Sequence, residues 1–146
     1  MEIVKLAGET LCSRGDCWDL GRTNRVPSPT LCFSINREIA VAYAKEIRMV
    51  ERRLLGLLSQ AVGLEEEHLP SKFGPDRLQM MSLNYYPACP RPDLTIGLQG
   101  HSDASAVSIL LQDLVGLQVL KDGHWLSVDP VPNAFVVNAG DILEVI

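Results

Sequence analysis

The strongest constraint on the fold is a change in the spacing of apolar residues partway along the chain. Between residues 37 and 61, apolar side chains recur at steps of three and four, as they do on one side of an α-helix. From Leu78 onward the spacing falls to two, and short apolar runs are separated by turn residues. Because no helical pattern interrupts these runs, the sequence predicts a helix followed by an antiparallel sandwich or barrel.

The helical pattern predicts one long helix from Arg37 to Ala61. Its apolar face is formed by side chains at helical spacing: Ile39, Tyr43, Ile47, Val50, Leu54, Leu58 and Ala61. Asn36 suits the N-cap, Glu38 suits the positive end of the helix dipole, and Gly63 suits the C-terminal stop. A short helical turn is expected from Leu64 to Leu69, ended by Pro70. Residues 37–75 are therefore predicted to be a helical region that supports the sheet.

The apolar runs that follow are predicted to be short strands. They are Leu78–Tyr86, Leu94–Leu98, Val107–Gln112, Leu117–Leu120, His124–Val128 and Ala134–Asn138. In the first run, alternation places Asn84 and Tyr86 on one face of the strand. The dipeptide Asp122-Gly123 predicts a tight hairpin. Residues 1–36 show no period, so we expect an irregular segment without a recognisable domain.

Charge and composition exclude some classes of partner. The formal net charge of -5 argues against nucleic acid or an anionic membrane as a partner. Arg48, Arg52 and Arg53 cluster only because they share the predicted helix, and a solvated helix face explains them. No apolar run approaches the roughly 18 residues that span a bilayer. The first residues also lack the order of a secretory signal, so a cytoplasmic protein is expected.

The cysteines do not predict a structural metal site. Four are present, at positions 12, 17, 32 and 89, and none forms a C-x-x-C pair. A structural zinc site needs two such closely spaced ligand pairs. We therefore expect reduced thiols, as is usual inside the cell.

The segment His101-Ser102-Asp103 carries the strongest chemical signal. In extended backbone, residues two apart point the same way, so the imidazole of His101 and the carboxylate of Asp103 converge. This pair supplies two corners of the 2-His-1-carboxylate triad that binds Fe(II) and leaves positions open for a cosubstrate and oxygen. On these residues alone, a plain His–Asp hydrogen bond on a sheet surface remains an alternative.

The surrounding residues resemble the plant 2-oxoglutarate/Fe(II)-dependent dioxygenases, the isopenicillin N synthase-like family that includes the flavonol and anthocyanidin synthases. The motifs that carry the resemblance run in order through the second half of the chain: residues 84–94, Gly97-Leu98, His101-Ser102-Asp103, residues 108–113, Gly116-Leu117-Gln118-Val119, Asp122-Gly123-His124-Trp125, residues 131–138 and residues 140–145. The likeness is dense from Leu78 to Ile146, looser over the helix, and absent before Arg37.

The resemblance implies a fold, a set of cofactors and a reaction. It implies a double-stranded β-helix (jelly roll), with residues 76–146 as the N-terminal part of the dioxygenase domain. His101 and Asp103 match the metal ligands, Asn84 and Tyr86 match positions that contact 2-oxoglutarate, and no further catalytic residue is implied. The cofactors would be Fe(II) and 2-oxoglutarate, with ascorbate as an added reductant. The reaction would be hydroxylation or desaturation of a small plant metabolite, which the sequence does not specify, and the oligomeric state is equally unspecified.

The sequence departs from the family pattern after the Gly140-Asp141 turn. The family's second iron histidine and its Arg-x-Ser, which binds 2-oxoglutarate, both follow this turn, and neither occurs in residues 1–146. His68 and His124 are not expected to replace the missing ligand. We therefore expect a jelly roll that is incomplete at its C-terminus and a chain that is inactive alone. Two alternatives stay open: a non-catalytic truncated fragment, and a relative of the aminocyclopropane-carboxylate oxidases that uses ascorbate instead of 2-oxoglutarate.

Overall fold

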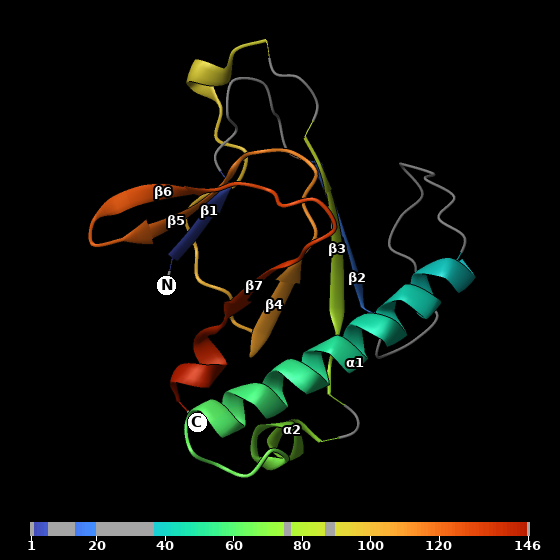
Figure 1. Cartoon of the computed structure of the whole chain (residues 1–146). Coiled ribbons are helices and arrows are strands. Elements are labelled where there is room, and N and C mark those ends of the chain that lie inside the picture. Colours follow the sequence, from blue (N-terminus) through green and yellow to red (C-terminus); the bar gives the residue numbers. More distant parts are fainter. Residues whose placement is uncertain (1, 6–13, 20–36, 75–76, 87–89, 146) are drawn as a thin grey trace. The chain divides into compact units, whose positions relative to one another are not determined.

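The computed structural model describes residues 2–5, 14–19, 37–74, 77–86 and 90–145 (Figure 1). Its helices are α1 (Arg37–Ala61), α2 (His68–Phe73) and two 3₁₀ turns, η1 (Pro92–Leu94) and η2 (Asp141–Glu144). Its strands are β1 (Glu2–Lys5), β2 (Arg14–Asp19), β3 (Met80–Tyr85), β4 (Val107–Leu110), β5 (Leu117–Lys121), β6 (His124–Val128) and β7 (Val136–Ala139). The architecture is thus a long helix followed by small antiparallel sheets. The helix capping role predicted for Asn36 lies outside the described residues.

The chain divides into two compact units. The helical unit comprises residues 16–83, and the strand unit comprises residues 1–15 together with 84–146. Two short strands, β1 and β2, lie within residues 1–36, where the sequence predicted no element. β1 joins the strand unit by pairing antiparallel with β5, from Glu2 opposite Leu120 to Lys5 opposite Leu117.

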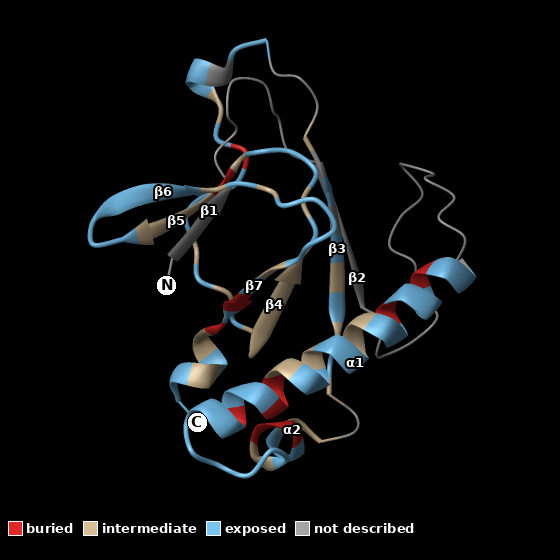
Figure 2. Ribbon diagram, viewed as in Figure 1, coloured by how far each residue is buried: buried red, intermediate tan, exposed pale blue. Residues whose placement is uncertain are grey.

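In the helical unit, the predicted helix has the predicted bounds but a different buried face. Ile39 is 65% exposed and Tyr43 41% exposed, so the expected apolar stripe is not the one that packs. Figure 2 shows short buried stretches, in red, between exposed ones along α1. The buried positions are small residues and one leucine: Ala40, Ala44, Leu55, Gly56 and Ser59. Small side chains let neighbouring backbone approach the helix closely, which an apolar-only pattern does not reveal.

The contact between α1 and α2 is built on a buried hydroxyl. The Ser59 hydroxyl donates to the Leu55 carbonyl at 2.9 Å and accepts the Leu69 N–H at 3.1 Å. Pro70 does not end a helix as predicted, because α2 begins at His68 and continues to Phe73. Proline fits there because N–H groups in the first turn of a helix have no intrahelical partner to lose.

Further polar contacts join α1 to the segment before β3, all within the helical unit. The Arg77 guanidinium donates to Oε2 of Glu51 at 2.7 Å and 3.0 Å, and both side chains are largely buried. Gln79 donates to the Ala44 carbonyl at 3.0 Å and accepts from Arg48 at 3.1 Å. Arg48 therefore has a structural contact, whereas Arg52 and Arg53 are exposed as predicted for a solvated face.

In the strand unit, the predicted hairpin is confirmed. β5 pairs antiparallel with β6, from Leu117 opposite Val128 to Lys121 opposite His124. The two turn residues, Asp122 and Gly123, both have positive φ, at 51° and 78°. A two-residue turn of this kind requires the left-handed region at both positions, and Asp-Gly adopts it readily.

The strand predicted from Leu94 to Leu98 is wrong. Pro92–Leu94 forms the 3₁₀ turn η1, and no strand follows it before Val107. The Arg91 carbonyl accepts both the Leu94 N–H at 3.2 Å and the Thr95 hydroxyl at 3.1 Å. These local hydrogen bonds offer the backbone an alternative to a sheet ladder, and this competition explains the failed prediction.

β4 and β7 form the two-stranded sheet beside the candidate site. They pair antiparallel from Val107 opposite Ala139 to Leu110 opposite Val136, with Ser108 opposite Asn138. The chain enters β4 directly from the His101–Asp103 segment and leaves β7 into Gly140 and η2. The His101–Asp103 segment therefore leads into one strand of this short sheet, and Gly140 and η2 follow the other strand.

Within the described residues, no helix is long and apolar enough to cross a membrane. Cys12, Cys32 and Cys89 lie outside those residues, so the prediction of reduced thiols stays a prediction.

Candidate metal centre

The His101–Asp103 segment is fastened to the end of β7 by backbone hydrogen bonds. The Asp141 N–H donates to the Asp103 carbonyl at 2.8 Å, and the Gly140 N–H donates to the Ala106 carbonyl at 2.9 Å. The Ser102 hydroxyl donates to Oδ2 of Asp141 at 2.8 Å. These bonds tie the segment to positions almost forty residues later, and so they fix its path before β4 begins.

Gly140 lets these two backbones approach. A Cβ at this position would lie 2.0 Å from the Ser105 carbonyl oxygen and 2.7 Å from the Asp103 carbonyl oxygen. The φ of Gly140 is -96°, which any residue adopts, so the need for glycine is one of space. The atoms in the way are backbone, which cannot rotate aside.

The structure brings the two predicted metal ligands together. Nε2 of His101 lies 3.5 Å from Oδ1 of Asp103, and the side chains are 39% and 25% exposed. A hydrogen bond between nitrogen and oxygen usually spans about 2.7–3.2 Å. The separation of 3.5 Å is therefore long for a His–Asp hydrogen bond. It leaves room for Nε2 and Oδ1 to face a third atom between them.

The other ring nitrogen of His101 sets the tautomer. Nδ1 lies 2.8 Å from the Gln99 carbonyl oxygen. Because a carbonyl only accepts hydrogen bonds, Nδ1 carries the proton in this contact, and the neutral ring has its lone pair on Nε2. Metal-binding histidines commonly use the same arrangement, with one nitrogen donating to a carbonyl and the other facing the ion.

This donor set fits a divalent metal ion. A lone pair on Nε2 and a carboxylate oxygen repel each other unless positive charge lies between them. Two ligand atoms held about 2 Å from one ion at a right angle would be about 3 Å apart, close to the observed 3.5 Å. Imidazole with carboxylate is the ligand chemistry of non-haem Fe(II) sites.

The second oxygen of Asp103 has a different partner. Nδ2 of Asn138, on β7, donates to Oδ2 of Asp103 at 2.9 Å. Asn138 is only 9% exposed, which makes it a buried polar residue in a sheet with few buried side chains. The two oxygens of the Asp103 carboxylate thus face different residues: Oδ2 faces Asn138, and Oδ1 faces His101.

The two residues expected to contact 2-oxoglutarate lie at the end of β3. Asn84 lies in the strand and is exposed, and Tyr86 follows it and is half-buried. Burial raises the pKa of the Tyr86 phenol above its ordinary value of 10.0. Both residues belong to the strand unit, as do His101 and Asp103.

The described residues do not complete a three-ligand site. No group of three or more His, Cys, Asp and Glu side chains able to hold a metal occurs among them. His124 opens β6 and is exposed, and His68 opens α2 in the helical unit.

Sequence reasoning missed the residues that hold the pair in place. Asn138 appeared only as the last residue of an apolar strand, and Gly140 and Asp141 appeared only as a turn. A polar residue inside an otherwise apolar run was the available signal for Asn138. The close approach at Gly140 had no local signal, because its cause lies at Asp103 and Ser105.

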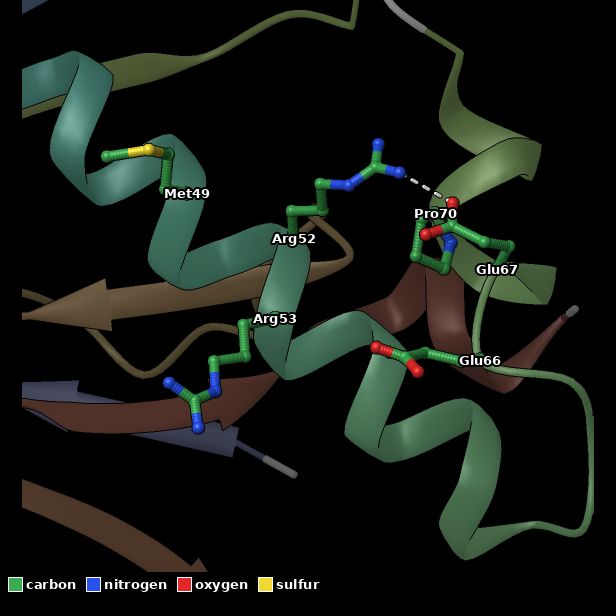
Figure 3. Close-up of a pocket in the computed structure, with 7 residues that line it drawn as sticks. Met49, Arg52, Arg53, Glu66, Glu67 and Pro70 are labelled. Carbon is green, nitrogen blue, oxygen red and sulfur yellow. Dashed lines mark hydrogen bonds and ion pairs between the residues drawn. The ribbon is translucent and has the colours of Figure 1, made fainter.

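The surface of the helical unit also has a small hollow, separate from this site. It is lined by Met49, Arg52, Arg53, Gly56, Glu66, Glu67 and Pro70. Figure 3 shows Arg52 turned toward Glu67, with which it forms an ion pair at 2.6 Å. Both side chains of this pair are mostly exposed, so the pair contributes little to stability.

Among the described residues, His101 and Asp103 thus present one ring nitrogen and one carboxylate oxygen that could bind the same metal ion. Residues 77–146 match the family model described as the 2OG-Fe(II) oxygenase superfamily. The chain belongs to this family of oxygenases, which use Fe(II) and 2-oxoglutarate.

Individual relatives agree with this assignment. The chain is 46% identical over 121 residues to Protein DMR6-LIKE OXYGENASE 1 of Arabidopsis thaliana, covering 82% of this chain and 34% of that protein. It is 44% identical over 110 residues to Flavanone 3-dioxygenase 2 of Oryza sativa subsp. japonica, covering 74% and 32%. The solved structure of JOX2 in complex with 2OG, Fe and JA matches with a TM-score of 0.82 and 34% identity, covering 94% of this chain and 45% of that one. The chain thus spans about a third of the length of the curated relatives that it matches.

Proposed function

We propose that this chain contributes part of a site for Fe(II)- and 2-oxoglutarate-dependent oxidation of a small molecule, by hydroxylation or desaturation. In this proposal His101 and Asp103 are two of the three protein ligands of the metal, and Asn84 and Tyr86 contact 2-oxoglutarate. The strand unit is then part of a double-stranded β-helix. The convergence of Nε2 of His101 with Oδ1 of Asp103 is the observation that carries the proposal.

The residues of the chain would bind and orient rather than transfer protons. His101 would offer the Nε2 lone pair, because its Nδ1 proton is engaged by the Gln99 carbonyl. Asp103 would offer one charged oxygen. When bound, the iron supplies the oxidation chemistry, in which 2-oxoglutarate and oxygen are consumed and succinate and carbon dioxide are released. Tyr86 stays a neutral hydrogen-bond donor well above neutral pH, since burial raises its pKa.

The substrate is proposed only at the level of chemical class. The solved relative JOX2 was crystallised with JA, and another relative is named as a flavanone dioxygenase. These names support a small organic molecule as the substrate of this chain.

The test is turnover by a polypeptide that supplies the third ligand. Residues 1–146 would be joined to the segment of a relative that carries a histidine and a following Arg-x-Ser. Succinate formation would be measured with Fe(II), 2-oxoglutarate, oxygen and a panel of flavonoid and carboxylic acid substrates. The expected result is succinate that depends on 2-oxoglutarate and is abolished by His101→Ala and Asp103→Ala. Equal turnover without 2-oxoglutarate but with ascorbate would favour the oxidase-like alternative, and no turnover with either would count against the proposal.

A further inference from the structure

We propose that Asn138 is a positioning residue of the metal site, which holds the Asp103 carboxylate so that a single oxygen is presented to the metal. The inference deepens the proposed function and rests on it. Its basis is the 2.9 Å hydrogen bond from Nδ2 of Asn138 to Oδ2 of Asp103.

The direction of this hydrogen bond follows from the chemistry of the two groups. An ionised carboxylate only accepts hydrogen bonds, so the Asn138 group that faces it is the NH₂. A hydrogen bond to a charged acceptor is stronger than one between neutral groups. Oδ2 is therefore held by the amide, while Oδ1 is left on the side of His101.

The amide is itself held rigidly. Asn138 is 9% exposed and lies opposite Ser108 in the two-stranded β4–β7 sheet, so its backbone is held by pairing with β4. Two residues further on, Gly140 and Asp141 bond to the backbone around Asp103. The backbone therefore already holds Asn138 and Asp103 near each other. Their side-chain hydrogen bond forms with little further loss of conformational entropy.

This geometry favours one mode of metal binding. If both oxygens of Asp103 were free, the carboxylate could turn or chelate an ion with both of them. With one lone pair of Oδ2 engaged by Asn138, Oδ1 is the oxygen that a metal ion would meet beside His101, and binding through this single oxygen is favoured over chelation by both. Residues that orient metal ligands in this way typically change metal affinity by about 10–100-fold when they are replaced.

The test compares substitutions that keep or remove the donor. Asn138→Leu has a similar size and no donor, and Asn138→Gln keeps an NH₂ on a longer side chain. Mn²⁺ binding to the 146-residue chain would be followed by paramagnetic broadening of the His101 imidazole resonances. We expect the apparent Kd to rise about 10–100-fold in Asn138→Leu and to recover in part in Asn138→Gln. Ser59→Ala, which disturbs a buried hydrogen bond in the helical unit, should leave the Kd unchanged.

The outcomes separate this inference from the proposed function. Wild-type protein that fails to bind Mn²⁺ at His101 would overturn the metal site itself. Wild-type protein that binds, together with an Asn138→Leu variant that binds equally well, would leave the metal site intact and overturn the role of Asn138. If Asn138→Leu does not fold, hydrogen exchange of the Asn138 side-chain amide in the wild-type protein tests the contact instead. Slow hydrogen exchange that is lost in Asp103→Ala supports the positioning contact, and fast exchange in the wild type refutes it.

Discussion

Replacing Gly140 with alanine tests the view that close backbone packing shapes the site. The new Cβ would lie 2.0 Å from the Ser105 carbonyl oxygen, and contacts under 3.0 Å are essentially never seen for real Cβ atoms. The backbone near Ser105 must therefore retreat by about 1 Å or more. The φ of -96° at Gly140 suits alanine, so no conformational strain contributes to this effect.

The expected destabilisation combines overpacking with lost hydrogen bonds. Overpacking in a rigid site costs about 1–3 kcal/mol. A retreat of this size also breaks or stretches the 2.8 Å bond from the Asp141 N–H to the Asp103 carbonyl, worth about 1 kcal/mol. We therefore expect a loss of about 3 kcal/mol, which corresponds to about 100-fold faster hydrogen exchange at the Asp141 amide.

Gly123→Ala is the matched control for this substitution. Gly123 lies in the same unit with φ at 78°, and nothing lies within 4 Å of its would-be Cβ. Its cost is conformational only, about 1–2 kcal/mol, and it falls on the β5–β6 hairpin. Hydrogen exchange at Asp141 should change by less than tenfold in this variant. An Asp141 amide equally protected in Gly140→Ala and wild-type protein would refute the steric reasoning.

Three further predictions concern polar groups. Ser59→Ala leaves the buried Leu69 N–H without its acceptor and should lower the free energy of unfolding of the helical unit by about 1–3 kcal/mol. Urea denaturation measures this loss, and a change below the error of that measurement would contradict the prediction. Arg77→Ala breaks the largely buried ion pair with Glu51 and should lower the free energy of unfolding by about 1–3 kcal/mol in the same assay. Arg52→Ala breaks the exposed ion pair with Glu67 and should lower it by less than about 1 kcal/mol. Equal losses in the two variants would contradict the role of burial. The Tyr86 phenol should ionise above pH 10.0, because burial raises its pKa. The stability that it contributes is therefore present below pH 10.0 and is lost as the pH rises through the pKa of the folded state. Phenolate absorbance, with Tyr86→Phe as the reference, checks this, and ionisation below pH 10.0 would contradict it.

The sequence predicted those elements whose cause is local. The helix from Arg37 to Ala61 follows from its spacing of apolar residues, and the hairpin follows from Asp122-Gly123, which satisfies its own turn. The strand expected after Leu94 failed, because side-chain and backbone bonds to Arg91 outcompete a ladder there. The buried face of α1 was also mispredicted, since small residues such as Ala40 and Ala44 pack while larger apolar ones stay exposed.

The candidate site was predictable only in part for a related reason. The spacing of His101 and Asp103 predicts convergence of their side chains, because alternation in extended backbone is a local property. The partners that orient them are distant in sequence, since Asn138 lies 35 residues from Asp103. Such contacts depend on which strands pair, and the register of β4 with β7 is set by the whole sheet rather than by either strand alone.

Metal binding at His101 is the most direct test of the account. Mn²⁺ would be titrated into the 146-residue chain, and the imidazole resonances of its three histidines would be compared. We expect His101 to broaden first, through Nε2, and the effect to disappear in Asp103→Ala, while His68 and His124 serve as internal references. Broadening of His101 no greater than that of His124, or unchanged by loss of the Asp103 carboxylate, would contradict the proposed metal site.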